Sequence, residues 1–483
     1  MGETSSPDGI ESTRLFTGSC AAVTALAFSF AAMSGVMYAL KGEFLLTNAQ
    51  VGLIGGAGLW GMAISQIGFS SIVDVVGMRN LMRLTFVGHV AGVLLFVTAT
   101  GFGGLFAGAL VMAIANGVIE AVCNPLVATL YPERKASMLN RLHLWFPGGI
   151  VLGGLAIWGL SYTDLSWRWS MAVVLAPAVL YAGLLATAKF PPTEAAQHGA
   201  RFTDAFRAVF TTPLLWLFLG LMAITMSLEL GPNRWIPAVL EAGGLSGILV
   251  LVMINGVMAV ARANAHALLS RVSPPVVLMI GTGVAGLGLL WLSYAGGLGQ
   301  TVASALVFAI GIAVVWPTMM GFISERAPRT GALGLGLMAA AGSLAVGIVT
   351  TPLLGEIADK HLPQIAPAAE VRTIAAQVAA QPGVTDPKLK EEALAMAGAP
   401  ALPADTGDFL RRAAAGEAGP GIAKAAGPVL AEAENRSGLL SFRYLVPFAA
   451  FVCLIFGLVI LMDRRAGGYA AQVARAQFQQ EPR

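Results

Sequence analysis

The stretch Ala109-Leu110-Val111-Met112-Ala113-Ile114 returns almost unchanged as Ala305-Leu306-Val307-Phe308-Ala309-Ile310, nearly half a chain length further on. Each copy lies inside a long apolar run. Two more pairs keep nearly the same offset, namely Ser70-x3-Asp74-x2-Gly77-Met78-Arg79 with Ala267-x3-Arg271-x2-Pro274, and Asn124-Pro125 before Glu133-Arg134 with Trp316-Pro317 before Glu325-Arg326. One match can arise by chance, but three in register predict two homologous halves.

The composition argues against a soluble protein. Of 483 residues, 56% are hydrophobic and 11% are charged, whereas a soluble domain carries about 25% charged residues. The net charge of +3 gives no reason to expect nucleic acid as a partner. Cys20, Cys123 and Cys453 each lie in an apolar run and are expected to be packed thiols, neither paired nor bound to metal. No phosphate-binding loop, dinucleotide fingerprint or metal-spaced cluster is present, so we expect neither an enzyme nor a cofactor.

Apolar segments of membrane-spanning length recur along the whole chain, since a bilayer core needs about 20 mostly apolar residues per helix. We predict twelve spans, at roughly 15–40, 50–73, 81–103, 104–131, 140–163, 168–188, 213–240, 245–270, 276–298, 300–323, 331–357 and 441–463. The fold class is therefore an all-α membrane protein of two pseudo-symmetric six-helix bundles.

The distribution of basic residues sets the expected orientation. One side of the membrane receives thirteen, and the opposite short loops hold only Lys41, Arg168 and Arg234. The thirteen are Arg79, Arg83, Arg134, Lys135, Arg141, Lys189, Arg201, Arg207, Arg271, Arg326, Arg329, Arg464 and Arg465. We therefore expect a multi-pass protein of the cell's inner (plasma) membrane with both termini cytoplasmic.

The chain divides into four parts, the third of which contains an insert. We expect a bundle over 1–188, a cytoplasmic connector over 189–212, a second bundle over 213–463 and a cytoplasmic tail over 464–483. In the connector, Phe202, Phe206 and Phe210 recur every four residues, as in an interfacial helix; a partly ordered linker is the alternative.

An Ala-rich insert over 360–437 is expected outside the cell. Its segments Glu370–Ala380, Pro387–Ala397 and Gly407–Ala415 favour short helices, which predicts a small helical cap; a mobile insert is the alternative.

Two parallel repeats joined by a central connector resemble the major facilitator superfamily. The loop between the second and third spans resembles that family's G-x3-D-x2-G-R-K motif through Asp74, Gly77 and Arg79. In the family this loop holds the cytoplasmic gate shut, and we expect that role for Asp74 and Arg79. Arg262 and Arg271, near the matching loop of the second half, are expected in the same gate. A helix end with capping charges is the simpler interpretation.

Ionisable side chains inside a span cost at least ~2.5 kcal/mol by insertion scales and usually face a cavity or a partner. Glu120 is near the middle of the fourth span with no basic residue close in sequence, so it is the first proton-coupling candidate. Glu229 in the seventh span is the second. Gly231 and Pro232 follow it and are expected to break the helix, as happens beside transporter substrate paths. Arg234 is expected either to pair with Glu229 or to lie in the outer headgroups.

Uncharged polar and aromatic residues complete the predicted binding site. His89 is expected to be a packing residue, because a lone membrane histidine more often bonds a neighbouring helix. The substrate-binding candidates are Gln66, Asn124, Asn140, His143, Trp145, Asn255 and Trp316. For the uncharged members, polar contacts between helices are the alternative.

One branch of the superfamily, the fucose–galactose–glucose:proton symporters, resembles this chain more closely. Its patterns E-x3-N-P, P-E and L-N-x2-[QH] match Glu120…Asn124-Pro125, Pro132-Glu133 and Leu139-Asn140-Arg141-Leu142-His143, and looser patterns match Glu229…Trp235 and Gly256…Arg262. The resemblance implies proton coupling at Glu120 and sugar contacts at Asn140 and His143. The acidic residue that fucose permease has in its first span has no counterpart here, and the insert is not typical of the branch.

The sequence thus predicts a secondary transporter that moves a small polar solute, most simply a sugar with protons, by alternating access, as a monomer in the lipid bilayer. A carrier for a drug, a lysolipid or an organic anion is the first alternative. A transporter-like sensor that moves nothing is the second.

Overall fold

The structure is a computed structural model that describes residues 11–70, 72–131, 135–192, 209–327, 331–384 and 386–478. Over these residues the chain is helical, with eleven helices long and apolar enough to cross a membrane and one shorter apolar helix, Gly247–Ala263. The twelve predicted spans correspond to these twelve segments. The predicted connector helix at Phe202 and Phe206 lies outside the described residues.

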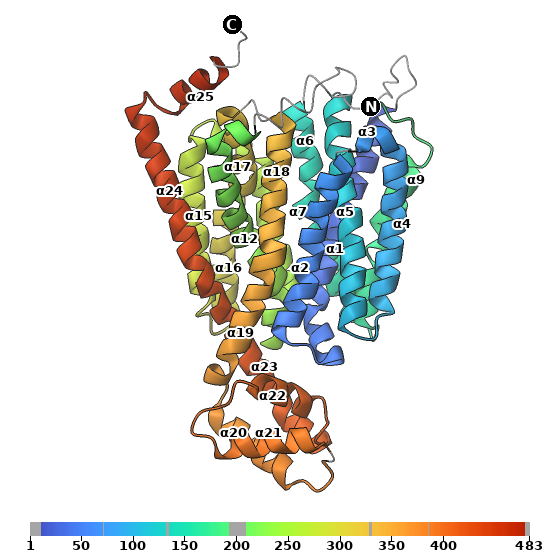
Figure 1. The fold of residues 1–483 in the computed structure, drawn as a ribbon, viewed down its shortest axis with the longest axis vertical. Coiled ribbons are helices and arrows are strands. Elements are labelled where there is room, and N and C mark those ends of the chain that lie inside the picture. The colour runs from blue at the N-terminus through green and yellow to red at the C-terminus, as the bar shows by residue number, and fades with distance from the viewer. Residues whose placement is uncertain are drawn as a thin grey trace.

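The first half of the chain forms one side of the bundle, drawn in blue to teal in Figure 1. Its long first helix packs against several of the other spans. The short helix α3 joins the second and third spans, α6 leads into the fifth, and α8 is the first part of the sixth. The elements are α1 (Ser12–Phe44), α2 (Asn48–Ser70), α3 (Val73–Val76), α4 (Met78–Val97), α5 (Phe102–Leu130), α6 (Lys135–His143), α7 (Trp145–Leu160), α8 (Trp167–Ala172) and α9 (Leu175–Leu185).

The second half forms the other side of the bundle and is drawn from green to red (Figure 1). A π-helical turn, η3, interrupts its eleventh span. The elements are α12 (Pro213–Ala242), α13 (Gly247–Ala263), α14 (Ala265–Leu269), α15 (Pro274–Leu292), α16 (Leu298–Ile312), α17 (Val315–Arg326), α18 (Gly331–Leu344), η3 (Ala345–Thr350), α19 (Thr351–Ile365), η4 (Phe442–Leu445), α24 (Val446–Arg465) and α25 (Tyr469–Phe478).

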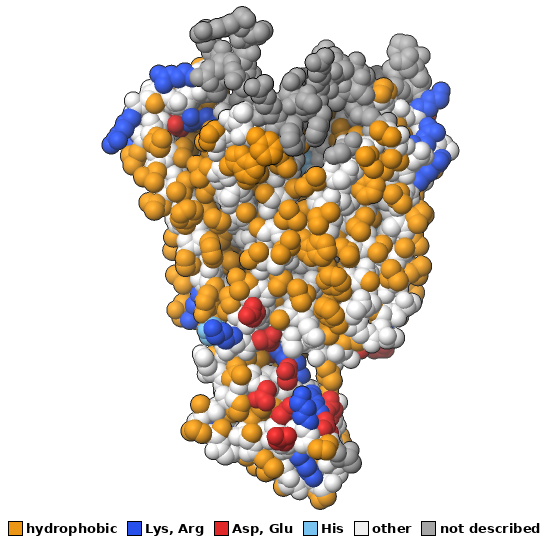
Figure 2. Space-filling model, viewed as in Figure 1, with side chains coloured by type: hydrophobic (Ala, Val, Ile, Leu, Met, Phe, Trp, Pro, Cys, Tyr) orange, Lys and Arg blue, Asp and Glu red, His pale blue; other side chains and the backbone are white. Residues whose placement is uncertain are grey.

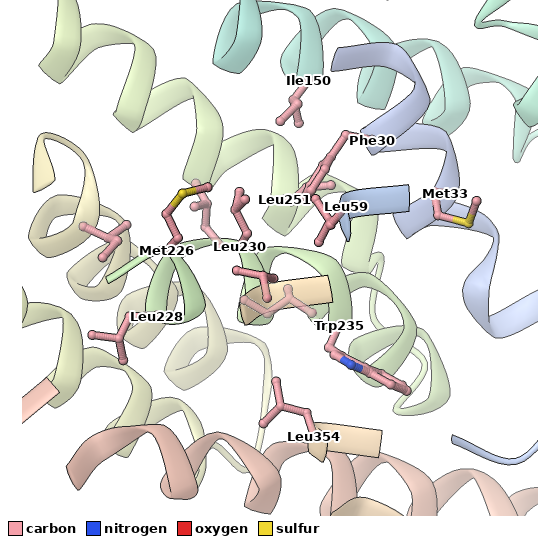
Figure 3. Close-up of a cluster of buried hydrophobic side chains, with 14 of the residues drawn as sticks. Phe30, Met33, Leu59, Ile150, Met226, Leu228, Leu230, Trp235, Leu251 and Leu354 are labelled. Carbon is pink, nitrogen blue, oxygen red and sulfur yellow. The ribbon is translucent and has the colours of Figure 1, made fainter. Parts of the chain in front are cut away.

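One apolar core crosses the boundary between the halves. Phe30 and Met33 of α1 belong to the same buried cluster as Leu230 and Trp235 of α12 (Figure 3). Arg234 of α12 also donates to the carbonyl of Phe30 at 3.0 Å. The two halves are therefore packed against each other through one apolar core.

Helix α2 and the η3–α19 segment approach each other closely, backbone against backbone. A Cβ atom placed on Gly56 would lie 2.1 Å from the carbonyl oxygen of Gly347, and one on Gly355 would lie 2.4 Å from that of Asn48. Only glycine fits such a contact, and small residues let membrane helices pack closely. This seam closes one end of the boundary between the halves.

The insert is a helical lobe at that same end, below the bundle in Figure 1, while α25 and the start of α1 lie at the opposite end. Its helices are α20 (Ala368–Ala380), α21 (Pro387–Gly398), α22 (Thr406–Ala414) and α23 (Pro420–Ser441). The three helices predicted in the insert are present, and α23 is a fourth that was not predicted. The lobe has its own apolar core, which includes Val371, Leu389 and Phe409.

Buried charges join the lobe to both halves. We call this group the lobe clamp: Lys41, Asn48, Asp359, Arg411 and Glu434. The Lys41 Nζ lies 2.7 Å from a Glu434 carboxylate oxygen, and Arg411 contacts Asp359 at 2.7 Å and Glu434 at 3.3 Å. Asn48 donates to Asp359 at 2.8 Å. Since Lys41 and Asn48 belong to the first half, the clamp crosses the boundary.

The outer surface of the bundle is a broad hydrophobic belt with charges gathered at its two ends and on the lobe (Figure 2). Leu94, Leu287 and Leu454 are among its exposed large side chains. Such a belt suits contact with lipid chains, as the membrane assignment requires.

Candidate functional site

A hydrogen-bonded chain of predicted site residues runs from α5 toward the second half. Asn124 Nδ2 donates to Glu120 Oε2 at 2.8 Å, and His143 Nε2 lies 2.9 Å from Asn124 Oδ1. Since an amide oxygen only accepts, the imidazole donates here. The His143 ring then contacts the Trp316 ring of α17, with 5.7 Å between centroids. We call these four residues the coupling network.

Local helix geometry explains why Glu120 and Asn124 lie together in this network. Glu120 and Asn124 are one turn apart, so their side chains share a face of α5. His143 is the last residue of α6, and Leu144 separates it from α7. At this junction between α6 and α7 the imidazole lies toward the boundary between the two halves, where it contacts Trp316. In the described part of the chain, no cation pairs with Glu120.

A cavity lies beside the boundary and is lined mainly by apolar side chains of α1, α2 and α5. Its polar lining residues are Ser29, Asn116 and Arg234, and the aromatic ones are Phe30 and Phe146. The two phenyl rings meet edge to face with 5.9 Å between centroids. Phe146 is three residues beyond His143, so the cavity and the coupling network lie on neighbouring turns.

A buried polar chain backs the cavity. Tyr181 and His89 lie 3.1 Å apart, His89 Nε2 is 2.9 Å from Asn116 Oδ1, and Asn116 donates to Ser29 Oγ at 2.8 Å. His89 thus bonds α4 to α5 and α9, which agrees with its prediction as a packing residue. The same bonds fix the orientation of Asn116 at the cavity wall.

The second carboxyl, Glu229, has a charged partner. Its Oε1 lies 2.8 Å from Arg262 Nη2, and both side chains are largely buried. Arg262 Nε also donates to the carbonyl of Ala313 at 2.9 Å. The sequence placed Arg262 in the cytoplasmic gate and offered Arg234 as the partner of Glu229; the contact instead joins Glu229 to Arg262.

Two further expectations about this region are wrong. Helix α12 runs without a break through Gly231 and Pro232, because the residues around them are packed on all sides and hold the helix together. Arg234 is neither a loop residue nor paired with Glu229: it lies inside α12 and is 2% exposed. It therefore does not belong among the basic residues of the outer loops.

The remaining binding candidates lie apart from the network. Asn255 is buried and donates to Asn233 Oδ1 at 3.3 Å, joining α13 to α12. Trp145 is 42% exposed, and Gln66 lies on α2 against α5. The side chain of Asn140 lies outside the described residues.

The gating candidates of the first half surround a tight turn. Gly77 has φ +84 between α3 and α4, a conformation that favours glycine. Arg79 donates to the carbonyl of Ala188 within the same half. Arg271 is exposed, and the side chain of Asp74 lies outside the described residues.

The contact between Arg234 and Phe30 was not predicted from the sequence. The guanidinium carbon lies 3.9 Å from the centroid of the Phe30 ring, across the boundary. A basic residue embedded in an apolar run was the available signal, but the neighbouring Gly-Pro pair pointed to a loop. Among the described residues, no group of three or more His, Cys, Asp or Glu side chains could hold a metal ion.

Two packed helical bundles with membrane-spanning helices and a cavity at their boundary have the architecture of a multi-pass membrane transporter. A sequence profile described as Major Facilitator Superfamily matches residues 18–351. The chain belongs to the major facilitator superfamily.

Known proteins similar to this chain are carriers. The galactose-proton symporter of Escherichia coli K12 is 25% identical over 180 residues, which is 37% of this chain and 38% of that protein. The alignment thus spans well under half of this relative's length.

Two solved structures share the fold. A bacterial homologue of the human lysosomal transporter Spinster, inward-facing and occupied, has a TM-score of 0.69 at 16% identity, over 93% of this chain and 97% of that one. A D-xylose-proton symporter has a TM-score of 0.61 at 17% identity, over 71% of this chain and 90% of that one.

Proposed function

We propose that this transporter takes up a sugar together with protons by alternating access. The observation that carries the proposal is the coupling network, in which a carboxyl bonded to a neutral amide is connected to an aromatic ring of the other half. The names of the symporters that resemble the chain, for galactose and for D-xylose, support the same choice.

Glu120 is the proposed proton carrier. Its carboxylate accepts from the Asn124 amide, and an ionisable side chain inside a span usually faces a cavity or serves a transport path. Protonation would accompany exposure of the site to the side with more protons. Release would follow when the site opens to the cytoplasm. Glu229 is the second choice for this role, since it would carry a proton only if Arg262 moved away.

His143 and Trp316 are the proposed contacts to the sugar. An imidazole and an amide offer neutral hydrogen bonds to hydroxyl groups, and an aromatic face packs on the apolar side of a sugar ring. Because the two rings belong to different halves, a bound sugar would respond to movement between the halves. The remaining binding candidates are proposed to contact the sugar at positions further from its ring, or in another state of the transport cycle. They are Asn140, Trp145, Gln66 and Asn255.

The orientation is proposed from the basic residues, with both termini cytoplasmic, the lobe outside the cell and the protein a monomer in the inner membrane. Cysteine placed at Ala415, in the lobe, should react with a membrane-impermeant maleimide in intact cells. Reaction only after permeabilisation would reverse the orientation.

The Asp74, Gly77 and Arg79 loop is proposed to close the cytoplasmic side, with Arg262 and Arg271 contributing from the second half. Asp74→Asn should then raise the inward-open fraction in distance measurements between this loop and α18. Unchanged distances would refute the gate.

Uptake into proteoliposomes tests the function itself. A panel of radiolabelled hexoses and pentoses is offered with and without an inward proton gradient. Accumulation of one sugar above equilibrium only with the gradient supports the proposal. Equilibration without accumulation would contradict proton coupling, and no sugar uptake at all would contradict the substrate class.

A further inference from the structure

Arg234 is a cation in the middle of the bundle without an acidic partner. It is 2% exposed, and in the described part of the chain no carboxylate lies within salt-bridge distance of it. The comparable arginines Arg262, Arg326 and Arg411 each contact a carboxylate.

Its contacts use one edge of the guanidinium and leave the other free. Nη1 donates to the carbonyl of Phe30 at 3.0 Å and to Ser34 Oγ at 3.3 Å. Nε makes no hydrogen bond, and among the described residues Arg234 donates side-chain hydrogen bonds from Nη1 alone. The Nε and Nη2 donors point the same way, and this paired edge is what a carboxylate accepts with its two oxygens.

The positive charge of Arg234 favours binding of an anion. Arginine does not lose its proton in proteins, and an unpaired charge inside a span is costly. The Phe30 ring supplies a cation–π contact. That contact and two neutral acceptors do not neutralise the charge.

Arg234 lies beside a small cavity at the boundary between the halves. It lines this cavity together with Asn116 and the Phe30 ring, and a solute would enter only in a more open arrangement of the halves. On α2, glycines stand opposite the guanidinium: a Cβ on Gly58 would lie 3.8 Å from Nη2, and one on Gly55 would lie 3.4 Å from the arginine Cδ. The site therefore offers one cation, one neutral polar group and an aromatic face.

We infer that the free edge of Arg234 binds a carboxylate of the transported solute, and that the substrate class is accordingly a sugar acid, such as a uronate. This inference rests on the proposed sugar transport and names its substrate more closely. The carboxylate would neutralise Arg234, while the hydroxyl groups would reach Asn116 and the coupling network.

Binding to the purified full-length protein tests the inference with three matched probes: D-glucuronate, its uncharged amide D-glucuronamide, and D-glucose. Wild-type protein should bind glucuronate at least about tenfold more tightly than glucuronamide, the loss expected when a paired charge is removed. Equal affinity for the acid and the amide would overturn the inference without the need for any variant.

Variants then locate the contact. Arg234→Lys should weaken glucuronate binding about tenfold, because the paired edge is lost while the charge remains. Arg234→Met should weaken it further and abolish the preference for the acid. Arg443→Met is the matched control, since Arg443 also stacks on an aromatic ring, at 3.7 Å from the Tyr294 centroid, but lies away from the cavity. Unchanged binding in a folded Arg234→Met protein would overturn the inference.

The two proposals fail in different ways. Gradient-driven uptake of a neutral hexose but not of glucuronate would overturn the role of Arg234 and leave sugar symport standing. Arg234-dependent glucuronate binding without gradient-driven uptake would uphold the role of Arg234 and contradict the proposed coupling.

Discussion

Each half of the bundle contains one glutamate deep inside a span, and the two have different partners. Glu120 of α5 accepts from the neutral Asn124 amide at 2.8 Å, whereas Glu229 of α12 lies 2.8 Å from the Arg262 guanidinium. The same type of side chain thus has a neutral partner in one half and a cationic partner in the other. We propose that this difference in partner makes Glu120 the better candidate to carry a proton.

The comparison predicts its largest effect for Glu120→Gln. The amide copies the protonated acid and cannot release a proton. Gradient-driven accumulation should therefore fall by at least about a hundredfold, which is the lower end of the 10²–10⁴-fold range for the loss of a proton-transfer group. Substrate binding and counterflow exchange should remain within about twofold, since the Gln side chain still accepts from Asn124. Uptake and exchange in proteoliposomes measure both quantities.

Glu229→Gln is the matched control for that experiment. Accumulation at the wild-type level in a folded Glu120→Gln protein would end the coupling role of Glu120. A loss confined to Glu229→Gln would transfer that role to the second half.

The ion pair between Glu229 and Arg262 in the second half should contribute measurably to the free energy of unfolding. Arg262→Met leaves Glu229 buried without its cation and should lower the free energy of unfolding by about 3–5 kcal/mol. Glu229→Met combined with Arg262→Met removes both charges and should recover most of the loss. Thermal unfolding in detergent measures the series. A double variant as unstable as the single one would mean that packing around Arg262, not charge pairing, is responsible.

A smaller effect is expected where the first network reaches the other half. His143→Phe keeps a ring against Trp316 but removes the bond to Asn124, which is worth about 1 kcal/mol. Sugar affinity should fall about fivefold with little change in melting temperature, and His143→Gln, which restores an N–H donor, should recover part of it. If His143→Phe changed stability but not affinity, the histidine would be a packing residue.

The smallest effect is expected at the lobe clamp. Its ion pair between Lys41 and Glu434 resembles the Glu229–Arg262 pair in burial but joins the two halves. Lys41→Met leaves Glu434 with Arg411 and should therefore shift the balance of open and closed forms only about threefold, below the ~1–3 kcal/mol usual for such couplings. Spin-label distances between α2 and α19 measure it. An unchanged balance with lower stability would make the clamp purely structural.

Much of the fold could be predicted because apolar length and repeat spacing are local properties of the sequence. The spans agree with the observed helices, and Glu120 and Asn124 were identifiable together since one turn separates them. The contact of His143 with Trp316 depends on how the halves pack, which no local pattern encodes.

The errors have the same origin. Gly231 and Pro232 weaken a helix locally, yet packing around α12 keeps it continuous. The partners of Arg234 and Arg262 were likewise decided by neighbours distant in the chain. Helix α23 was missed because Gly and Pro residues interrupt its sequence, while burial of Ile422, Ala426 and Val429 holds it in place.

The lobe has a practical consequence for controlling the transporter. The chain runs into the lobe from the eleventh span through α19 and returns to the twelfth span through α23. The lobe is thus connected through the chain to the second half, and it lies beside the α1–α2 turn of the first half, where Lys41 and Asn48 contact it and α19. With the lobe outside the cell and the halves moving in alternating access, as proposed, an antibody fragment that binds both α22 and this turn would hold the two halves in one arrangement. It would act from the aqueous side, without reaching the membrane.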